Sequence, residues 1–555
     1  METILEFQNV SYKYSGEKNW VLKDINLKIP RNSFFVLAGP SGCGKTTLLT
    51  LARGFYKEYG GAFGGDIFVS GENIKEKDIA ELGSKIGIVF QDPALQLHQL
   101  RVIDEVMSAL MYQNLPFEEC EKRAKKIIKE ILDESFCQRS PQELSCGEQQ
   151  KVALAASLVM DCDILLLDEP FSFLNEKADK ELMEILLKLK QKGKTIVMAT
   201  HDLEQIAKYA DQIALMDKGK VVLQGTSQEV LYSKELEEIL TTPLLIKMGK
   251  ALLSKGKSQH PIVDWLDLTN KFKQEINQPK KQIEQKTNFK KDALKLNNLV
   301  FHYSDNKKGV ENINLPFYEK EIVGIIGANG SSKTTLAKLI LGLLKPQQGK
   351  IELKGKDITK LSTSERAKQI GYVTQNPIDM LFEENVLKEC MFGPKCLKLD
   401  NPEKRAKDTL AKMDLLKYKD KHPDSLSGGE RSKLAIADIL ASQGAILVLD
   451  EPEFGLDIKS WQAIAQILKQ IKNEGKTIIV ITQDLEISLF LCDRIAIMKE
   501  GKILQIGAPK EIFCNNELLT QAQLPSLPIF QLLNLVLNEA LLSEEKFVEN
   551  IISLI

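Results

Sequence analysis

Two short glycine-rich segments contain a lysine followed by hydroxyl side chains, a combination that can bind phosphate. The first, GPSGCGKT, follows a strand-like apolar segment and precedes a helix-like one. In that context the backbone N–H groups surround a β-phosphate, the lysine neutralises phosphate oxygens, and the first threonine binds Mg²⁺. The candidate phosphate-binding residues of this loop are Gly39, Pro40, Ser41, Gly42, Cys43, Gly44, Lys45, Thr46 and Thr47.

The second segment, GANGSSKT, keeps the lysine and the threonine but has Ser332 in place of the last glycine. Nucleotide binding is therefore still expected here. The added side chain lies next to the phosphate and could distort the loop. The candidate residues of this loop are Gly327, Ala328, Asn329, Gly330, Ser331, Ser332, Lys333, Thr334 and Thr335.

Each loop is followed along the chain by an apolar segment that ends in two carboxylates, ILLLDEP and ILVLDEP. Such a segment can simply be the end of a strand, but the lysine loop before it favours phosphate chemistry. We expect Asp168 and Asp450 to hold Mg²⁺ through its water shell. We expect Glu169 and Glu451 to orient or deprotonate an attacking water. The predicted reaction is hydrolysis of a nucleoside triphosphate with Mg²⁺ as cofactor.

These motifs occur twice because the chain is an internal duplication with a nearly constant offset between matching residues. The period is far too long for a solenoid. FFVLAG, IGIVF, ILLLDE and TIVMAT are predicted to be buried strands, and GIIG, IGYVT, ILVLDE and TIIVIT repeat them. They alternate with segments of helical period, so each half is predicted to be an α/β domain with a mainly parallel sheet. LEFQNVSYKY and LKLNNLVFHY alternate better and predict an antiparallel β-subdomain.

The predicted organisation has two large domains, residues 1–240 and 293–515. Helical appendages are predicted at 241–265 and 516–555, from PLLIKMGKALL and PIFQLLNLVLNEALL. Residues 266–292 are predicted to be a lysine-rich solvated linker, with a basic phosphate-binding arm as the alternative.

Composition excludes several classes of protein. The formal net charge of −2 draws the chain neither to nucleic acid nor to anionic lipid. The nine cysteines include no Cys-x-x-Cys pair, which argues against iron–sulfur and structural zinc sites. The first residues lack a signal-peptide pattern, and no apolar run of membrane-spanning length occurs. We therefore expect a peripheral protein whose membrane role depends on a partner.

LSCGEQ and LSGGE are similar to the signature motif of ABC ATPases, and together with the loops and carboxylates they make the chain resemble that family over nearly its whole length. The resemblance implies two tandem P-loop domains, each with a helical signature subdomain. It also implies that each signature binds the γ-phosphate held by the opposite domain, so the two halves pair to form two composite sites. The signature candidates are Ser145, Gly147, Ser427, Gly428 and Gly429.

The resemblance assigns further roles. Tyr14 and Tyr303 would stack on adenine, and Gln91 and Gln375 would touch Mg²⁺ and sense a transmembrane partner. His201 would contact the γ-phosphate. The alternatives are a half-buried strand tyrosine, a surface amide and a structural histidine. The implied metal ligands are Thr46, Gln91, Asp168, Thr334, Gln375 and Asp450.

The departures from the family pattern gather in one composite site. In the second half, Gln483 replaces the histidine and Ser332 replaces a glycine. In the first half, Asn175 replaces an aspartate that the second half retains as Asp457. Asn175 and the first signature belong to the composite site that contains Ser332 and Gln483. Gln cannot become a cation, so it stabilises phosphoryl charge less than a protonated histidine. We expect the site with Lys45, Glu169 and His201 to hydrolyse ATP well, and the site with Lys333 and Glu451 to be slow.

The segment QNPIDMLFEENVLKECMFGP resembles the ATPase subunits of energy-coupling-factor importers, which take up vitamins and metal ions. That implies a transmembrane scaffold subunit with coupling helices, a membrane subunit that captures the substrate, and a position at the cytoplasmic face of the membrane. A fused sugar-importer ATPase and a ribosome-associated double cassette remain alternatives. No nucleic-acid partner is expected, because the lysine-rich linker is short and poor in aromatic residues. A DNA-repair cassette protein is excluded because its zinc-binding cysteine pairs are absent.

Overall fold

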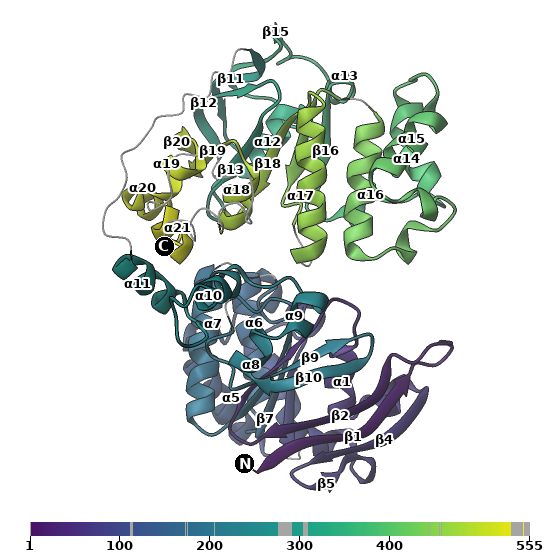
Figure 1. The fold of residues 1–555 in the computed structure, drawn as a ribbon, viewed down its shortest axis with the longest axis vertical. Helices are drawn as coiled ribbons and strands as arrows, with labels where there is room; N and C mark the ends of the chain where they lie inside the picture. Colours follow the sequence, from purple (N-terminus) through teal and green to yellow (C-terminus); the bar gives the residue numbers. More distant parts are fainter. Residues whose placement is uncertain are drawn as a thin grey trace. The chain divides into compact units, whose positions relative to one another are not determined.

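The chain forms two units, Met1–Asp264 and Trp265–Ile555, which are described separately (Figure 1). The computed structural model describes residues 2–111, 115–172, 174, 176–204, 206–275, 291–303, 309–442, 444–453, 456, 458–533 and 548.

The first unit is built around a six-stranded sheet with the order β10-β9-β3-β8-β7-β6. Its strands are β3 (Phe34–Ala38), β6 (Ile86–Val89), β7 (Ile164–Asp168), β8 (Thr195–Thr200), β9 (Gln212–Asp217) and β10 (Lys220–Thr226). All neighbours pair in parallel except β9 with β10. Every residue of β3, β6, β7 and β8 is buried, which explains their uninterrupted apolar sequences. The four predicted strands are confirmed.

A second, antiparallel sheet of the first unit has the order β2-β1-β4-β5. Its strands are β1 (Thr3–Lys13), β2 (Leu22–Pro30), β4 (Ala62–Val69) and β5 (Glu72–Asn73). Buried side chains on β1 and β2 share one apolar core with β3 and α1 (Lys45–Ala52). The alternating LEFQNVSYKY segment therefore forms the predicted antiparallel subdomain, which packs beside the phosphate loop.

The other helices of the first unit follow the predicted alternation with strands. They are α2 (Tyr56–Tyr59), α3 (Ile79–Lys85), α4 (Val102–Met111), α5 (Phe117–Ile131), α6 (Cys146–Leu158), α7 (Glu176–Gln191), α8 (Ser227–Leu231), α9 (Lys234–Ile239) and α10 (Leu244–Ser254). Helices α4, α5 and α6 pack on one another as a helical subdomain inserted between β6 and β7. Helix α10 lies within the PLLIKMGKALL segment that was predicted to be helical.

The second unit repeats this plan. Its sheets have the orders β16-β17-β18-β13-β19-β20 and β12-β11-β14-β15. The strands are β11 (Asp292–Phe301), β12 (Val310–Tyr318), β13 (Ile322–Ile326), β14 (Gln348–Leu353), β15 (Lys356–Asp357), β16 (Ile370–Val373), β17 (Ile446–Asp450), β18 (Thr477–Thr482), β19 (Arg494–Lys499) and β20 (Lys502–Gly507). Strands β13, β16, β17 and β18 are those predicted from the repeated apolar segments.

The helices of the second unit include a matching helical subdomain of α14, α15 and α16. The helices are α11 (Trp265–Glu275), α12 (Lys333–Leu341), α13 (Thr363–Arg366), α14 (Val386–Cys396), α15 (Pro402–Lys412), α16 (Gly428–Ala441), α17 (Ile458–Asn473), α18 (Leu485–Leu491), α19 (Pro509–Phe513), α20 (Asn516–Ala522) and α21 (Pro528–Leu533). None of the helices in the described part of the chain has the length and apolar character needed to cross a membrane.

The segment predicted to be a solvated linker begins with a helix. Helix α11 packs on α21, and its Leu268 and Phe272 are fully buried. These two side chains are four residues apart and so lie on one face of the helix. The lysine-rich composition of the segment predicts a solvated linker and gives no indication of this apolar face. The rest of the linker, residues 276–290, lies outside the described residues, as do most of the residues of the C-terminal appendage beyond 533. The finer domain boundaries therefore remain a prediction.

Candidate nucleotide-binding site

The phosphate loop of the first unit joins β3 to α1 and depends on its glycines. Gly44 has a φ of 108° directly before α1, in the region that favours glycine. At Gly39 an added Cβ would lie 2.5 Å from the carbonyl oxygen of Met216. Because both positions exclude side chains for steric reasons, the loop backbone can pass close to the sheet and turn into the helix.

Lys45 is buried and held by the loop that precedes it. Its Nζ donates to the carbonyl oxygens of Gly39 at 2.6 Å and Pro40 at 3.1 Å. The same Nζ lies 3.5 Å from Oε1 of Glu169. The cation is therefore fixed between the loop backbone and a carboxylate, where it can neutralise phosphate oxygens.

Thr46 and Asp168 form the part of the site that suits a divalent cation. The hydroxyl of Thr46 donates to Oδ2 of Asp168 at 2.6 Å. The other oxygen, Oδ1, is buried and has no hydrogen-bond partner among the described residues. Burial raises the pKa of Asp168. An unpaired buried carboxylate oxygen beside a hydroxyl fits the oxygen ligands and bound waters that Mg²⁺ prefers.

Glu169 and His201 meet because they follow adjacent parallel strands. Asp168 at the end of β7 pairs with Ala199 of β8, so both strands end at one edge of the sheet. Glu169 has a φ of 46° and donates its N–H to the carbonyl of Ala199 at 2.9 Å. Its Oε1 lies 2.9 Å from Nδ1 of His201. The strained backbone thus turns the carboxylate toward the histidine.

The two groups shift each other's protonation. For Glu169, burial acts upward, but the hydrogen bond and charge of His201 and the charge of Lys45 outweigh it and lower the pKa. For His201, burial acts downward, but the hydrogen bond and charge of Glu169 outweigh it and raise the pKa. The geometry therefore favours an ionised carboxylate beside a protonated imidazole, a pair suited to orienting water and stabilising phosphoryl charge.

Two other predicted residues flank this group. The hydroxyl of Tyr14 lies 3.1 Å from that of Thr47, and its ring is 6.1 Å from the ring of Tyr59. Tyr14 is therefore next to the phosphate-loop helix, as an adenine-stacking residue must be. Gln91 follows β6 and is exposed, and it makes no hydrogen bond to Asp168 or Glu169 among the described contacts.

The second phosphate loop has the geometry of the first. Lys333 Nζ donates to the carbonyl oxygens of Gly327 at 2.6 Å and Ala328 at 3.2 Å. Ser332 adopts a left-handed conformation with a φ of 75°. The distortion considered from the sequence is therefore not seen in the position of the lysine.

A neighbouring substitution makes room for Ser332. An added Cβ at Gly44 would lie 2.7 Å from Cδ2 of Leu22. The matching position in the second unit is Val310, whose shorter side chain lacks that carbon. A β-carbon at this position would thus press on Leu22 in the first unit, whereas the second unit lacks the carbon that it would meet.

The carboxylates of the second unit have different neighbours. Oε1 of Glu451 accepts from Nε2 of Gln483 at 2.6 Å, and Oε2 accepts from Nε2 of Gln375 at 2.5 Å. Two neutral amides thus hold both oxygens of the glutamate. Tyr303 repeats the position of Tyr14, with its hydroxyl 3.3 Å from that of Thr335.

Sequence reasoning missed two further groups in this site. The hydroxyl of Tyr372 donates to Oδ2 of Asp450 at 3.1 Å, where the first unit has the apolar Ile88. The hydroxyl of Thr482 donates to Glu453, and burial raises the pKa of this glutamate to about 8. The sequence signal for Tyr372 is a phenol at the position where the matching strand of the first half, IGIV, has an isoleucine.

The two signature motifs open helices, as predicted. Ser145 and Ser427 are the N-cap residues of α6 and α16, and each exchanges hydrogen bonds with the glutamate three residues later. Gly147, Gly428 and Gly429 lie in the first turns, so the N–H groups there can face an anion. Asn175 and Asp457 lie outside the described residues.

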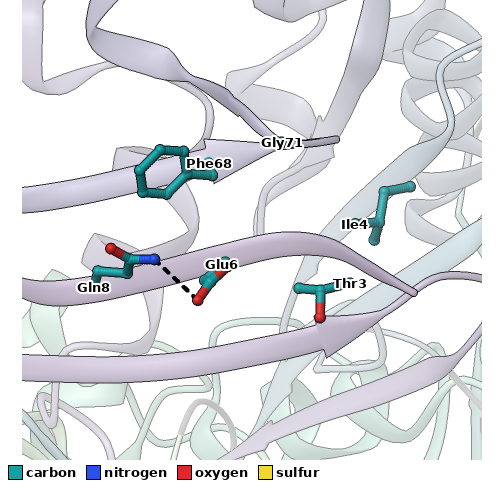
Figure 2. Close-up of a pocket in the computed structure, with 6 residues that line it drawn as sticks. All are labelled: Thr3, Ile4, Glu6, Gln8, Phe68 and Gly71. Carbon is teal, nitrogen blue, oxygen red and sulfur yellow. Dashed lines mark hydrogen bonds between the residues drawn. The ribbon is translucent and has the colours of Figure 1, made fainter. Parts of the chain in front are cut away.

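A pocket of about 250 Å³ lies elsewhere, on the antiparallel sheet of the first unit (Figure 2). Gln8 donates to Glu6 there at 3.1 Å, and neither belongs to the phosphate motifs. This pocket is lined by Thr3, Ile4, Glu6, Gln8, Phe68 and Gly71. The candidate nucleotide site is therefore identified by the positions of the phosphate-motif residues, and this pocket is not part of it.

Comparisons with known proteins agree with the geometry. The family described as ABC transporter matches residues 22–172 and 310–453. ABC transporter ATP-binding proteins of Methanosarcina mazei and Bacillus cereus are 33% and 31% identical, covering 95% and 99% of this chain and 93% and 98% of their own lengths. The solved structure of cbiO1 from Clostridium perfringens, titled as part of the ABC transporter complex cbiONQ, is 34% identical to this chain. The match covers 44% of this chain and 98% of the cbiO1 chain, with a TM-score of 0.39. The family match and the two relatives show that the chain belongs to the ABC transporter family, as an ATP-binding protein with two ABC ATPase domains in tandem.

Proposed function

We propose that this ABC ATPase is the motor subunit of an energy-coupling-factor importer, which takes up a vitamin or metal ion through separate membrane subunits. The observation that carries the proposal is the segment after Gln375, Q-N-P-x-x-x-L-F followed by F-G-P, which resembles that group of ATPases. The first half lacks the F-G-P ending, so the second half carries the subfamily assignment.

The same segment supports a docking surface for a membrane partner. Phe382 and Phe392 are 64% and 38% exposed, and their rings lie 4.7 Å apart in an edge-to-face contact. Glu389 fixes the segment, because its Oε2 accepts from the N–H groups of Phe382 at 2.9 Å and Glu383 at 2.7 Å. A clustered exposed aromatic pair is typical of an interaction site.

The first half has a related but aliphatic surface. Leu95 and Leu100 are 76% and 83% exposed after Gln91. Glu105 accepts there from the N–H groups of His98 and Gln99, both at 2.7 Å. Two similar but unequal surfaces suit two coupling helices of a scaffold subunit, which would hold the chain at the cytoplasmic face of the membrane.

For the first site we propose roles that follow from the geometry. Thr46, Gln91 and Asp168 would hold Mg²⁺, which when bound neutralises charge on the β- and γ-phosphate oxygens. Lys45 and the loop N–H groups bind the ATP phosphates, while Tyr14 stacks on the base. Glu169 orients the attacking water and accepts its proton, and His201 stabilises the charge that develops on the γ-phosphate.

For the second site, with Thr334, Gln375 and Asp450 as the proposed metal ligands, we propose slower hydrolysis. Both oxygens of Glu451 accept from amide donors, so an attacking water must displace one amide to reach the carboxylate. Gln483 supplies no positive charge to the developing phosphoryl group. Because Gln375 belongs to the proposed docking segment, a partner that moves this segment would also change the hydrogen bonding of Glu451.

The test is co-purification from solubilised membranes with and without the aromatic pair. Exchange of Phe382 and Phe392 for aspartate should abolish recovery of the membrane subunits while leaving ATP binding unchanged. Leu361→Asp is a matched control, because Leu361 is 39% exposed in the same half but lies outside the segment. Recovery of ribosomes, or of a sugar permease, in place of a scaffold and a capture subunit would refute the proposal.

A further inference from the structure

The two halves also differ at Tyr372, a residue outside the family motifs, where the first half has Ile88. It lies on β16, where it pairs with Val448 of the neighbouring parallel strand β17. Side chains two residues apart on a strand share a face, so Tyr372 and Asp450 lie on the same face of the sheet. The phenol can therefore reach past Val448 to the carboxylate that ends β17, and its hydroxyl donates to Oδ2 of Asp450 at 3.1 Å.

The surroundings hold the phenol in place. Its ring is partly buried against the apolar core of the second unit, so the direction of the hydroxyl is set by packing on the core as well as by the hydrogen bond. In the first unit Ile88 pairs with Leu166 at the matching position and supplies no donor. The Oδ1 of Asp168 lacks a hydrogen-bond partner among the described residues, whereas the carboxylate of Asp450 accepts a hydrogen bond from Tyr372.

We propose that Tyr372 is a positioning residue of the second site, which fixes the carboxylate of Asp450 in advance for the metal–nucleotide complex. Groups that hydrogen-bond to a metal-binding carboxylate orient it, and their loss typically lowers metal affinity 10- to 100-fold. The second site thus combines a glutamate whose two oxygens are held by amides with a preorganised metal ligand. It retains Mg²⁺-ATP while the first site turns over. This inference rests on the proposed metal role of Asp450.

The test measures metal-dependent nucleotide binding at each half of the full chain, without reference to turnover. The protein is photolabelled with 8-azido-ATP over a series of Mn²⁺ concentrations, and peptide mapping assigns the label to the first or second half. In Tyr372→Phe, the Mn²⁺ concentration for half-maximal labelling of the second half should rise about 10-fold. Labelling of the first half, and labelling of either half in EDTA, should not change.

Tyr232→Phe is the matched control. Tyr232 is also a tyrosine whose hydroxyl is held by hydrogen bonds, donating to the carbonyl of Ile262 and accepting from its N–H, both at 2.8 Å, but it belongs to none of the phosphate motifs. This variant should leave both Mn²⁺ curves unchanged. A Tyr372→Phe curve for the second half that coincides with wild type would overturn the inference, and so would an equal loss of labelling in EDTA, which would mean a purely structural role. If Mn²⁺ has no effect on the wild-type second half, the proposed metal role of Asp450 fails first.

Discussion

The two phosphate sites of this chain agree in one respect and differ in another. In both, the lysine is held by two loop carbonyls, at 2.6 and 3.1 Å in the first unit and at 2.6 and 3.2 Å in the second. The proposed catalytic carboxylate has different neighbours in the two sites, because Glu169 faces His201 and Lys45 whereas Glu451 is held by Gln375 and Gln483. After duplication, the phosphate-binding geometry was kept while the surroundings of the attacking water changed.

The first prediction asks whether the difference between the carboxylates matters for turnover. Glu169→Gln should lower the ATPase rate about 10²-fold, because it removes the proposed general base of the faster site and leaves only the slow second site. Glu451→Gln should change the rate less than about twofold, since the second site contributes little turnover. The measurement is steady-state phosphate release by the two purified variants, and equal losses would break the comparison.

The second prediction converts one site toward the other. His201→Gln places in the first site the residue that the second site already has. Removal of a charge-stabilising contact typically costs about 10²-fold in rate, so this variant should retain about 1% of activity while its affinity for ATP stays close to wild type. A rate within threefold of wild type would show that the glutamine at 483 does not explain a slow second site.

The third prediction tests why a serine is tolerated in only one loop. Gly44→Ser should weaken nucleotide binding to the first half about 10-fold or more, because its β-carbon would collide with Leu22 and its backbone would be strained. Ser332→Gly should have little effect on the second half. Labelling of each half with 8-azido-ATP provides the measurement, and Gly44→Ser combined with Leu22→Val should recover part of the loss. No recovery would contradict the steric explanation.

The fourth prediction concerns pH. The pKa of His201 is raised by Glu169, and the protonated form is the one that we propose to stabilise phosphoryl charge. As pH rises through that raised pKa the protonated fraction falls, so the wild-type ATPase rate should decline severalfold on the alkaline side of 6.5, the ordinary pKa of histidine. The residual activity of His201→Gln should lack this decline. An alkaline decline that persists in the variant would point to another group.

The amino-acid sequence alone determined the duplication, the buried parallel strands, and the residue types of both phosphate sites, because these follow from local motifs and from apolar periodicity. It also located Ser332 and Gln483 as departures from the family pattern.

Only the tertiary structure decided how these residues are surrounded. The contact of Tyr372 with Asp450 depends on the register of two strands far apart in the chain, and the room for Ser332 depends on Val310 having one carbon fewer than Leu22. The linker helix was missed for the same physical reason, since Leu268 and Phe272 are buried in a helix that packs on α21, a segment distant in the sequence. Periodicity can indicate which residues are buried, but the partner of each side chain is set by packing between segments distant in the sequence.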